Sequence, residues 1–151
     1  MPSHSLFLNL TFYQLLYRII KMIKPYIERV EKPWGYELIL TPPDCPVVSK
    51  ILHVNKGRRL SYQYHELKKE TLTLISGRAK IVFNDEEIEM EIKKGYYVQP
   101  MQKHRFVGIA DCDIIEVSTK EEGTTVRLQD DYKRQDETEE LRKQPNRGWQ
   151  G

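Results

Sequence analysis

The sequence predicts an all-β fold, an antiparallel sandwich or barrel. Short runs of alternating or β-branched residues recur through residues 47–128, and turn-forming residues stand between them. Many short strands at regular spacing favour antiparallel sheets over a parallel sheet built from βαβ units. With 151 residues the chain is long enough for one domain with a substantial core and too short for two.

The expected strands follow one another along the middle of the chain. They cover residues 47–54, 60–65, 71–75, 79–83, 87–92, 96–99, 105–109, 113–118 and 125–128. Glycine, asparagine and aspartate mark the turns between them, at residues 55–57, 76–77, 84–85, 93–95 and 110–111.

Residues 1–24 are expected to form an extension with helical character. Apolar residues recur there at helical spacing, at Leu8, Phe12, Leu15, Ile19 and Ile23. No lysine or arginine precedes the apolar run and Arg18 interrupts it, so neither a signal peptide nor a membrane span is expected. Two interpretations stay open: a helix that packs on the barrel or on a dimer partner, or a natural translation start at Met22.

The carboxy-terminal residues 135–151 are predicted to be a polar, mobile tail. They are rich in charged residues, contain Pro145 and Gly148, and have almost no apolar periodicity.

Overall charge and cysteine content exclude several classes of protein. Lysine and arginine number 24 against 22 acidic residues, and a pI near 8.4 is too low for the basic footprint of a nucleic-acid-binding domain. The two cysteines, Cys45 and Cys112, are too few for a disulfide framework and lack zinc-ribbon spacing. We therefore expect a cytoplasmic protein that binds neither nucleic acid nor membrane.

Four polar residues in neighbouring strand segments predict a metal site. Strand alternation sends Gln63 and His65 to one face, Glu70 opens the next run, and His104 follows a later one. Taken singly, His65 is equally well explained as a strand histidine and Glu70 as a solvated turn carboxylate.

Jointly, the four supply the imidazole nitrogen and the carboxylate and amide oxygen that a divalent metal of intermediate softness takes. A buried carboxylate among them needs a cation. The predicted cofactor is a divalent metal, with zinc as the first choice and manganese, iron, cobalt or nickel as alternatives.

The spacing of these residues resembles that of a known family. The stretch Gly57-(x5)-Gln63-x-His65-(x4)-Glu70-(x6)-Gly77, followed by Gly95-(x4)-Pro100-(x3)-His104, resembles the paired motifs of the cupin superfamily. It is most similar to small cupins related to the C-terminal domain of type II mannose-6-phosphate isomerases. With its flanks, at residues 30–35, 116–119 and 126–134, the resemblance covers residues 30–134.

This resemblance implies a single-domain cupin jelly roll, to which residues 25–134 are assigned. It also implies that Gln63, His65, Glu70 and His104 converge in a semi-enclosed bowl. Many cupins carry a second histidine where this chain has Leu67, and the isomerase-like relatives use the glutamine that Gln63 matches. The turn at residues 100–104 is one residue shorter than the usual pattern and lacks its glycine.

The implied activity is the aldose–ketose isomerisation of a sugar phosphate such as mannose 6-phosphate, by a homodimer. Glu116 and Lys50 are candidates for acid–base catalysis, since alternation can turn both into the bowl. A cationic phosphate ligand is a second role open to Lys50, and exposed strand residues are the alternative for both. Arg127 is the candidate phosphate ligand, because a guanidinium matches phosphate oxygens. A surface salt bridge from Arg127 to Asp130 or Asp131 is the alternative.

Two other functions stay open. One is a cupin that binds a sugar, sugar nucleotide or small metabolite without turning it over, because a fold does not dictate an activity. The other is a cupin dioxygenase, in which His65, Glu70 and His104 hold iron through two imidazoles and a carboxylate. Gln63 argues against the dioxygenase, because it fills a position that oxygen and substrate need.

Overall fold

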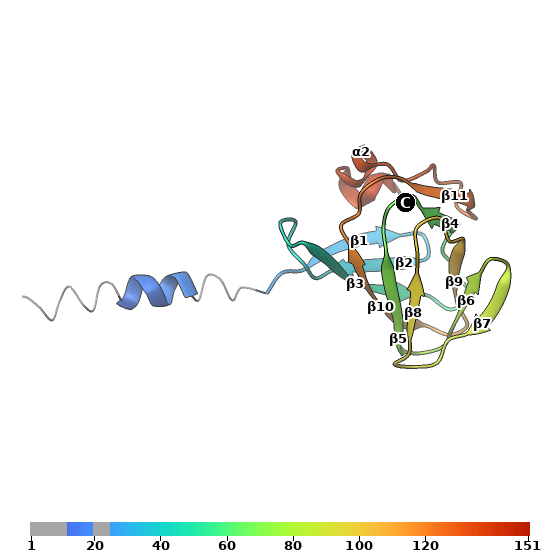
Figure 1. The fold of residues 1–151 in the computed structure, drawn as a ribbon, viewed down its shortest axis with the longest axis horizontal. Coiled ribbons are helices and arrows are strands. Elements are labelled where there is room, and N and C mark those ends of the chain that lie inside the picture. The colour runs from blue at the N-terminus through green and yellow to red at the C-terminus, as the bar shows by residue number, and fades with distance from the viewer. Residues whose placement is uncertain (1–11, 20–24) are drawn as a thin grey trace, which may run out of the picture.

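The computed structural model describes residues 12–19 and 25–151 and confirms the all-β fold (Figure 1). Within residues 25–151 the chain forms eleven strands: β1 (Glu28–Lys32), β2 (Gly35–Ile39), β3 (Val47–Val54), β4 (Tyr62–His65), β5 (Glu70–Ser76), β6 (Ala79–Phe83), β7 (Glu86–Glu89), β8 (Gly95–Val98), β9 (His104–Gly108), β10 (Cys112–Thr119) and β11 (Thr125–Gln129).

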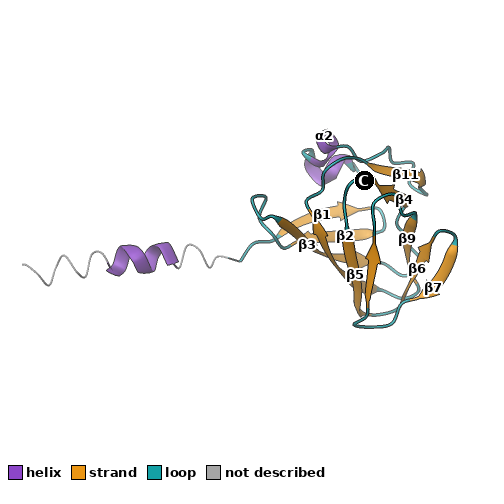
Figure 2. Ribbon diagram, in the orientation of Figure 1, coloured by secondary structure: helices purple, strands orange, loops and turns teal. Residues whose placement is uncertain are grey.

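The strands form two antiparallel sheets that face each other. One has the order β1-β2-β3-β10-β5-β8 and the other the order β11-β4-β9-β6-β7. Every expected strand is present, and β1 and β2 are added ahead of them. Figure 2 shows the strands wrapped around a common interior, with the short helices at one end. The strand pattern predicted these antiparallel sheets, and the arrangement is the jelly roll that the cupin resemblance implied.

An apolar core fills the interior between the sheets. Its buried members come from both sheets and from the loops that join them, and they include Trp34, Leu52, Val54, Leu60, Leu72, Leu74, Ile81, Met90, Val98, Phe106, Cys112 and Ile114. Strand alternation explains the selection, because residues two apart share the inward face.

The inward face of the larger sheet changes from apolar to charged at one end. Buried Leu52, Leu72 and Ile114 are each two residues from a buried charged side chain on the same strand. These charged residues are Lys50 on β3, Glu70 on β5 and Glu116 on β10. The register aligns them, since Glu116 pairs with Lys50 and its neighbour Ser118 pairs with Glu70. The sheets thus build an apolar core with a charged cavity above it.

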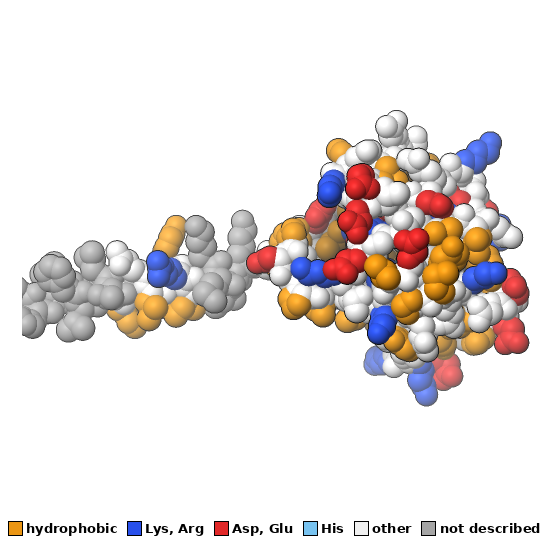
Figure 3. Space-filling model, turned by 45° about the horizontal axis from the view of Figure 1, so that its top comes forward, with side chains coloured by type: hydrophobic (Ala, Val, Ile, Leu, Met, Phe, Trp, Pro, Cys, Tyr) orange, Lys and Arg blue, Asp and Glu red, His pale blue; other side chains and the backbone are white. Residues whose placement is uncertain are grey.

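Residues 12–19 form a helix, and all of its side chains are exposed (Figure 3). Leu8, Met22 and Ile23 lie outside the described residues. Within the described residues, no helix has the length and apolar character needed to cross a membrane.

The prediction of a mobile tail is wrong for residues 135–151. They fold over the mouth of the barrel (Figure 1). They form α2 (Glu139–Arg142), capped by the Thr138 hydroxyl, and the 3-10 turn η1 (Pro145–Gly148). Polar composition misled the prediction. Arg142 and Arg147 are not solvated but form ion pairs with carboxylates that the barrel buries.

Candidate metal centre and charged cavity

Three side chains from β4, β5 and β9 bring metal-ligand atoms together at the charged end of the barrel. Nε2 of His65 and Nε2 of His104 each lie 3.1 Å from Oε1 of Glu70. The three residues offer ligand atoms that all lie within 4.8 Å of one another, and all three are buried. Two imidazoles and one carboxylate at this spacing suit a divalent transition-metal ion.

The hydrogen bond at the far side of each imidazole directs the other nitrogen inward. Nδ1 of His104 donates to the carbonyl of Gln102 at 2.9 Å, so Nε2 is the nitrogen that faces Glu70. That Nε2 is buried and has no hydrogen-bond partner among residues 12–19 and 25–151, although Glu70 is close. On His65, Nδ1 lies 2.9 Å from the Thr125 hydroxyl.

The pKa values of His65 and Glu70 are shifted in the directions that favour binding of a cation. Burial, and then Lys68, lower the pKa of His65 to about 4, so its imidazole is neutral near pH 7. Although burial favours the neutral acid, Lys68 and His65 hold the pKa of Glu70 well below its usual range. A carboxylate therefore faces the Nε2 atoms of two imidazoles in a buried site, an arrangement that a bound cation stabilises.

Gln63, the fourth predicted ligand, lies beside these three. It is the cross-strand partner of His104 and lines the same cavity. Its Oε1 accepts a hydrogen bond from the Ser61 hydroxyl. The structure therefore brings all four predicted metal residues to one cavity, with three ligand atoms converging and the amide at the side.

The short turn before His104 keeps the histidine in place without a glycine. Met101 adopts a left-handed backbone with φ of 64°, the conformation for which glycine is the usual residue. Its N–H donates to the carbonyl of His65 at 2.8 Å. The turn is thereby fixed to the end of β4, and His104 begins β9 opposite Gln63.

Lys68 is a functional candidate that the sequence pattern missed. Its ammonium lies 2.6 Å from Oε2 of Glu70 and 2.9 Å from Oε1 of Glu116. It stands in the loop between β4 and β5, next to Leu67, which is 59% exposed. No periodicity marks a buried lysine there. The available signal was charge balance, since two carboxylates in one bowl need a cation.

Glu116 faces into the cavity, as strand alternation allowed. Its side chain is buried and accepts a hydrogen bond from Lys68. Burial raises its pKa above the usual value for a glutamate, against the opposing pull of Lys68. Among the five glutamates that line this cavity, Glu116 is the one whose pKa is raised, a property typical of carboxyl groups that exchange protons.

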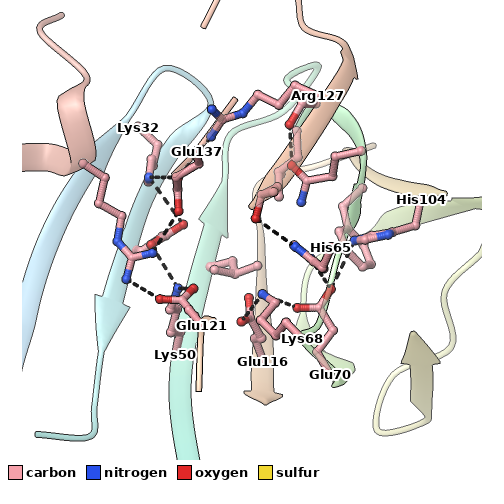
Figure 4. Close-up of a pocket in the computed structure, with 18 of the residues that line it drawn as sticks. Lys32, Lys50, His65, Lys68, Glu70, His104, Glu116, Glu121, Arg127 and Glu137 are labelled. Carbon is pink, nitrogen blue, oxygen red and sulfur yellow. Dashed lines mark hydrogen bonds and ion pairs between the residues drawn. The ribbon is translucent and has the colours of Figure 1, made fainter. Parts of the chain in front are cut away.

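Lys50 lies in the same cavity but in a different ion network. Its ammonium is 2.5 Å from Oε1 of Glu121 and 3.6 Å from Oε2 of Glu37. Figure 4 shows the two groups of side chains, with Lys50, Glu121, Glu137 and Lys32 on one side and the metal-ligand candidates on the other.

Arg127 also points into this cavity and not toward either aspartate considered for it. Its Nη2 lies 3.1 Å from Oε2 of Glu137. Asp130 pairs with Arg134 instead, and Asp131 pairs with Arg59. The candidate phosphate ligand is thus held by a carboxylate of the carboxy-terminal segment.

The cavity itself is small, at ≈ 50 Å³. A water molecule needs about 10–15 Å³ on this kind of measure, and pockets for drug-sized ligands measure about 300–1,000 Å³. A metal ion and a few waters fit this volume, whereas a hexose phosphate requires side chains at the mouth to move. A second, open pocket of ≈ 420 Å³ adjoins it, and Glu121 and Arg147 line both.

Comparison with known families identifies the chain. Residues 22–137 match the family model described as mannose-6-phosphate isomerase C-terminal. This chain belongs to that family. No protein with a curated description matches it.

Solved structures with similar folds are cupins of varied function. KdgF from a Halomonas species is 13% identical over 61% of this chain and 84% of its own, with a TM-score of 0.56. A cupin 2 domain-containing protein from Halorhodospira halophila is 13% identical over 70% of this chain and 86% of its own, with a TM-score of 0.57.

Oxalate decarboxylase from Bacillus subtilis, a protein with Mn(II) centres, is 16% identical over 68% of this chain, with a TM-score of 0.58. This chain corresponds to 30% of that longer one. Identities this low support the cupin fold alone and transfer no activity.

Proposed function

We propose that this member of the family is a divalent-metal-dependent isomerase that interconverts an aldose phosphate and its ketose. The observation that carries the proposal is the joint burial of three metal-ligand side chains beside a carboxyl group with a raised pKa. Lys68 connects them, because it contacts both Glu70 and Glu116.

The charge of the cavity supports an anionic substrate. Six cationic side chains line it, Lys32, Lys50, Lys68, Arg127, Arg134 and Arg147, against five glutamates. Arg134 pairs with Asp130 outside the lining, so the remaining five cations and five glutamates balance, and a divalent ion gives the cavity a surplus of positive charge. A substrate that carries a phosphate compensates the surplus.

His65, Glu70 and His104 would hold the ion, with Gln63 able to add its amide oxygen. When bound, such an ion polarises a substrate carbonyl and stabilises the negative charge of an enediolate. Zinc is the first candidate, and manganese, iron, cobalt and nickel suit the same nitrogen and oxygen ligands.

Proton transfer falls to Glu116. As a carboxylate it takes the proton from C2 of the aldose, and as the acid it returns that proton to C1, while the hydroxyl proton of O2 passes to O1 across the enediolate. Burial raises the pKa of Glu116, and a raised pKa makes its carboxylate a stronger base. Lys68 orients the carboxylate through its 2.9 Å hydrogen bond. Lys50 has no proton-transfer role here, since Glu121 and Glu37 hold its ammonium.

The test is metal analysis of the purified protein followed by assays on mannose 6-phosphate and a panel of hexose and pentose phosphates. We expect metal-dependent conversion of at least one. Full metal occupancy without turnover would refute the isomerase and favour a binding cupin. Oxygen consumption with an iron-loaded protein would favour the dioxygenase.

A further inference from the structure

One carboxylate from the carboxy-terminal segment sits among four cationic side chains. Glu137 lies 3.1 Å from Arg127, 3.1 Å from Arg147, 3.2 Å from Arg142 and 3.8 Å from Lys32. Against the effect of burial, Lys32 and then Arg147 hold its pKa far below the usual range, so it is ionised at any physiological pH. We call this group of four cations the cationic nest.

Positive charge exceeds negative charge around the nest. Five cations, the nest and Lys50, form ion pairs with three carboxylates, Glu37, Glu121 and Glu137. Burying uncompensated charge is costly, so the surplus favours an anion with more than one negative charge.

An unused donor points to the same conclusion. Nε of Arg127 is buried without an acceptor in the described part of the chain, while its side chain is only 7% exposed. A carboxylate has two oxygens to offer, and Glu137 shares them among four cations. A phosphate offers three terminal oxygens and up to two charges, and it can engage a guanidinium through two parallel bonds.

We propose that the cationic nest is the binding site for the phosphate group of the substrate, and that Glu137 occupies it as an internal substitute. This inference rests on the proposed function for the identity of the substrate. The anion site itself is inferred from the ion pairs around Glu137 alone. Substrate phosphate displaces the Glu137 carboxylate, which moves toward solvent. Arg127 then contacts the substrate phosphate, as the sequence predicted, and Lys32 and Arg147 contact it as well.

The displaced segment is also the one that restricts the cavity. The backbone N–H and carbonyl of Glu137 pair with those of Thr125 at 3.0 Å, and the Thr125 hydroxyl lies 2.9 Å from Nδ1 of His65. Asn146 and Arg147 adopt left-handed backbones, with φ of 46° and 50°, which non-glycine residues rarely hold. Release of Glu137 opens the mouth of a cavity too small for a hexose phosphate.

The first test measures binding of inorganic phosphate to the full chain by calorimetric titration. Replacing Glu137→Gln removes the competing charge, so phosphate should bind at least tenfold more tightly than to the parent. Glu140→Gln is the matched control, because it removes a fully exposed carboxylate three residues away on α2. A folded Glu137→Gln protein with unchanged or weaker phosphate affinity would overturn the proposal.

A second measurement does not depend on that variant being folded. In the parent protein, saturating phosphate should speed hydrogen exchange in residues 136–148, because Glu137 leaves the nest. Unchanged or slower exchange there would show that phosphate binds elsewhere and would overturn the proposal.

A competition experiment distinguishes a site for the phosphate group from a site for the sugar. Mannose 6-phosphate should compete with inorganic phosphate for the nest, and mannose should not. Competition by mannose itself would contradict a site for the phosphate group. Phosphate binding as predicted, without turnover of any sugar phosphate, would refute the isomerase and leave the anion site standing.

Discussion

Lys68 donates to Glu116 at 2.9 Å, and the same ammonium lies 2.6 Å from Glu70. One buried cation therefore joins the group proposed to move protons to a group proposed to hold the metal. Although burial opposes its charge, Glu116 and Glu70 raise the pKa of Lys68, so it remains an ammonium and does not act as a base.

Glu116→Gln should abolish proton transfer while leaving the metal bound. The amide keeps the shape of the side chain but accepts no proton, so kcat for the preferred sugar phosphate should fall about 10²–10⁴-fold. Steady-state kinetics with metal analysis of the same sample provide the test. Glu91→Gln, an exposed change, should leave kcat unaltered. Retained turnover in the Glu116 variant would assign the base to another residue.

Lys68→Met should destabilise the metal-free protein and reduce turnover, because it leaves two buried carboxylates without their shared cation. Added metal should restore part of the lost stability, since a cation again faces Glu70. Melting curves with and without added zinc measure this. A variant as stable and as active as the parent would show that Lys68 has no role in the site.

The metal-free protein should lose stability as the pH falls from about 6.5 to about 4. His65 takes up a proton near pH 6.5 when unfolded but only near pH 4 when folded, so the unfolded state binds more protons in this window. The effect amounts to at most about 3 kcal/mol, at 1.36 kcal/mol per pKa unit. Urea unfolding across this range measures the slope, and His65→Asn should flatten it. An equal slope in both proteins would contradict the assignment to His65.

Arg147→Gln should destabilise the domain by about 1–3 kcal/mol, because Glu121 and Glu137 lose a buried hydrogen-bond partner but keep Lys50 and Arg127. Arg78→Gln breaks an exposed pair with Glu89 and should cost less than about 1 kcal/mol. Urea unfolding of the two variants compares them directly. Equal, small effects would mean that residues 135–151 do not hold the fold together.

Deletion of residues 1–21 should leave the melting temperature and the metal content unchanged. The helix at residues 12–19 exposes all its side chains, so its removal uncovers no core. Size-exclusion chromatography of both forms also tests the expected homodimer. An insoluble or less stable truncated protein would assign the extension a structural role.

Alternation along single strands predicted much of this architecture, because every second residue of a strand points to the same face of the sheet. It placed Gln63 beside His65 and allowed Glu116 to face inward, and the cupin resemblance set His104 with them. β1 was missed because four of its five residues are charged and three of the five are exposed, so it shows little apolar alternation.

Residues whose burial depends on distant partners were beyond the sequence pattern. Glu137 and Arg147 look solvated in a polar stretch, and only folding of that stretch onto β1 and β11 buries them against Lys32 and Arg127. Lys68 sits in a polar loop with no periodicity. In each case the contact that buries the residue joins a loop or tail to a strand, and a contact between distant segments cannot be predicted from the local sequence.

The central claim is that His65, Glu70 and His104 hold a divalent ion, and elemental analysis of matched variants tests it most directly. The parent should carry about one ion per chain, and His65→Ala should lose most of it while remaining folded. His53→Ala removes an imidazole that instead pairs with Asp113, and it should keep the ion. Full occupancy in a folded His65→Ala protein, or no bound ion in the parent after incubation with zinc or manganese, would contradict the account.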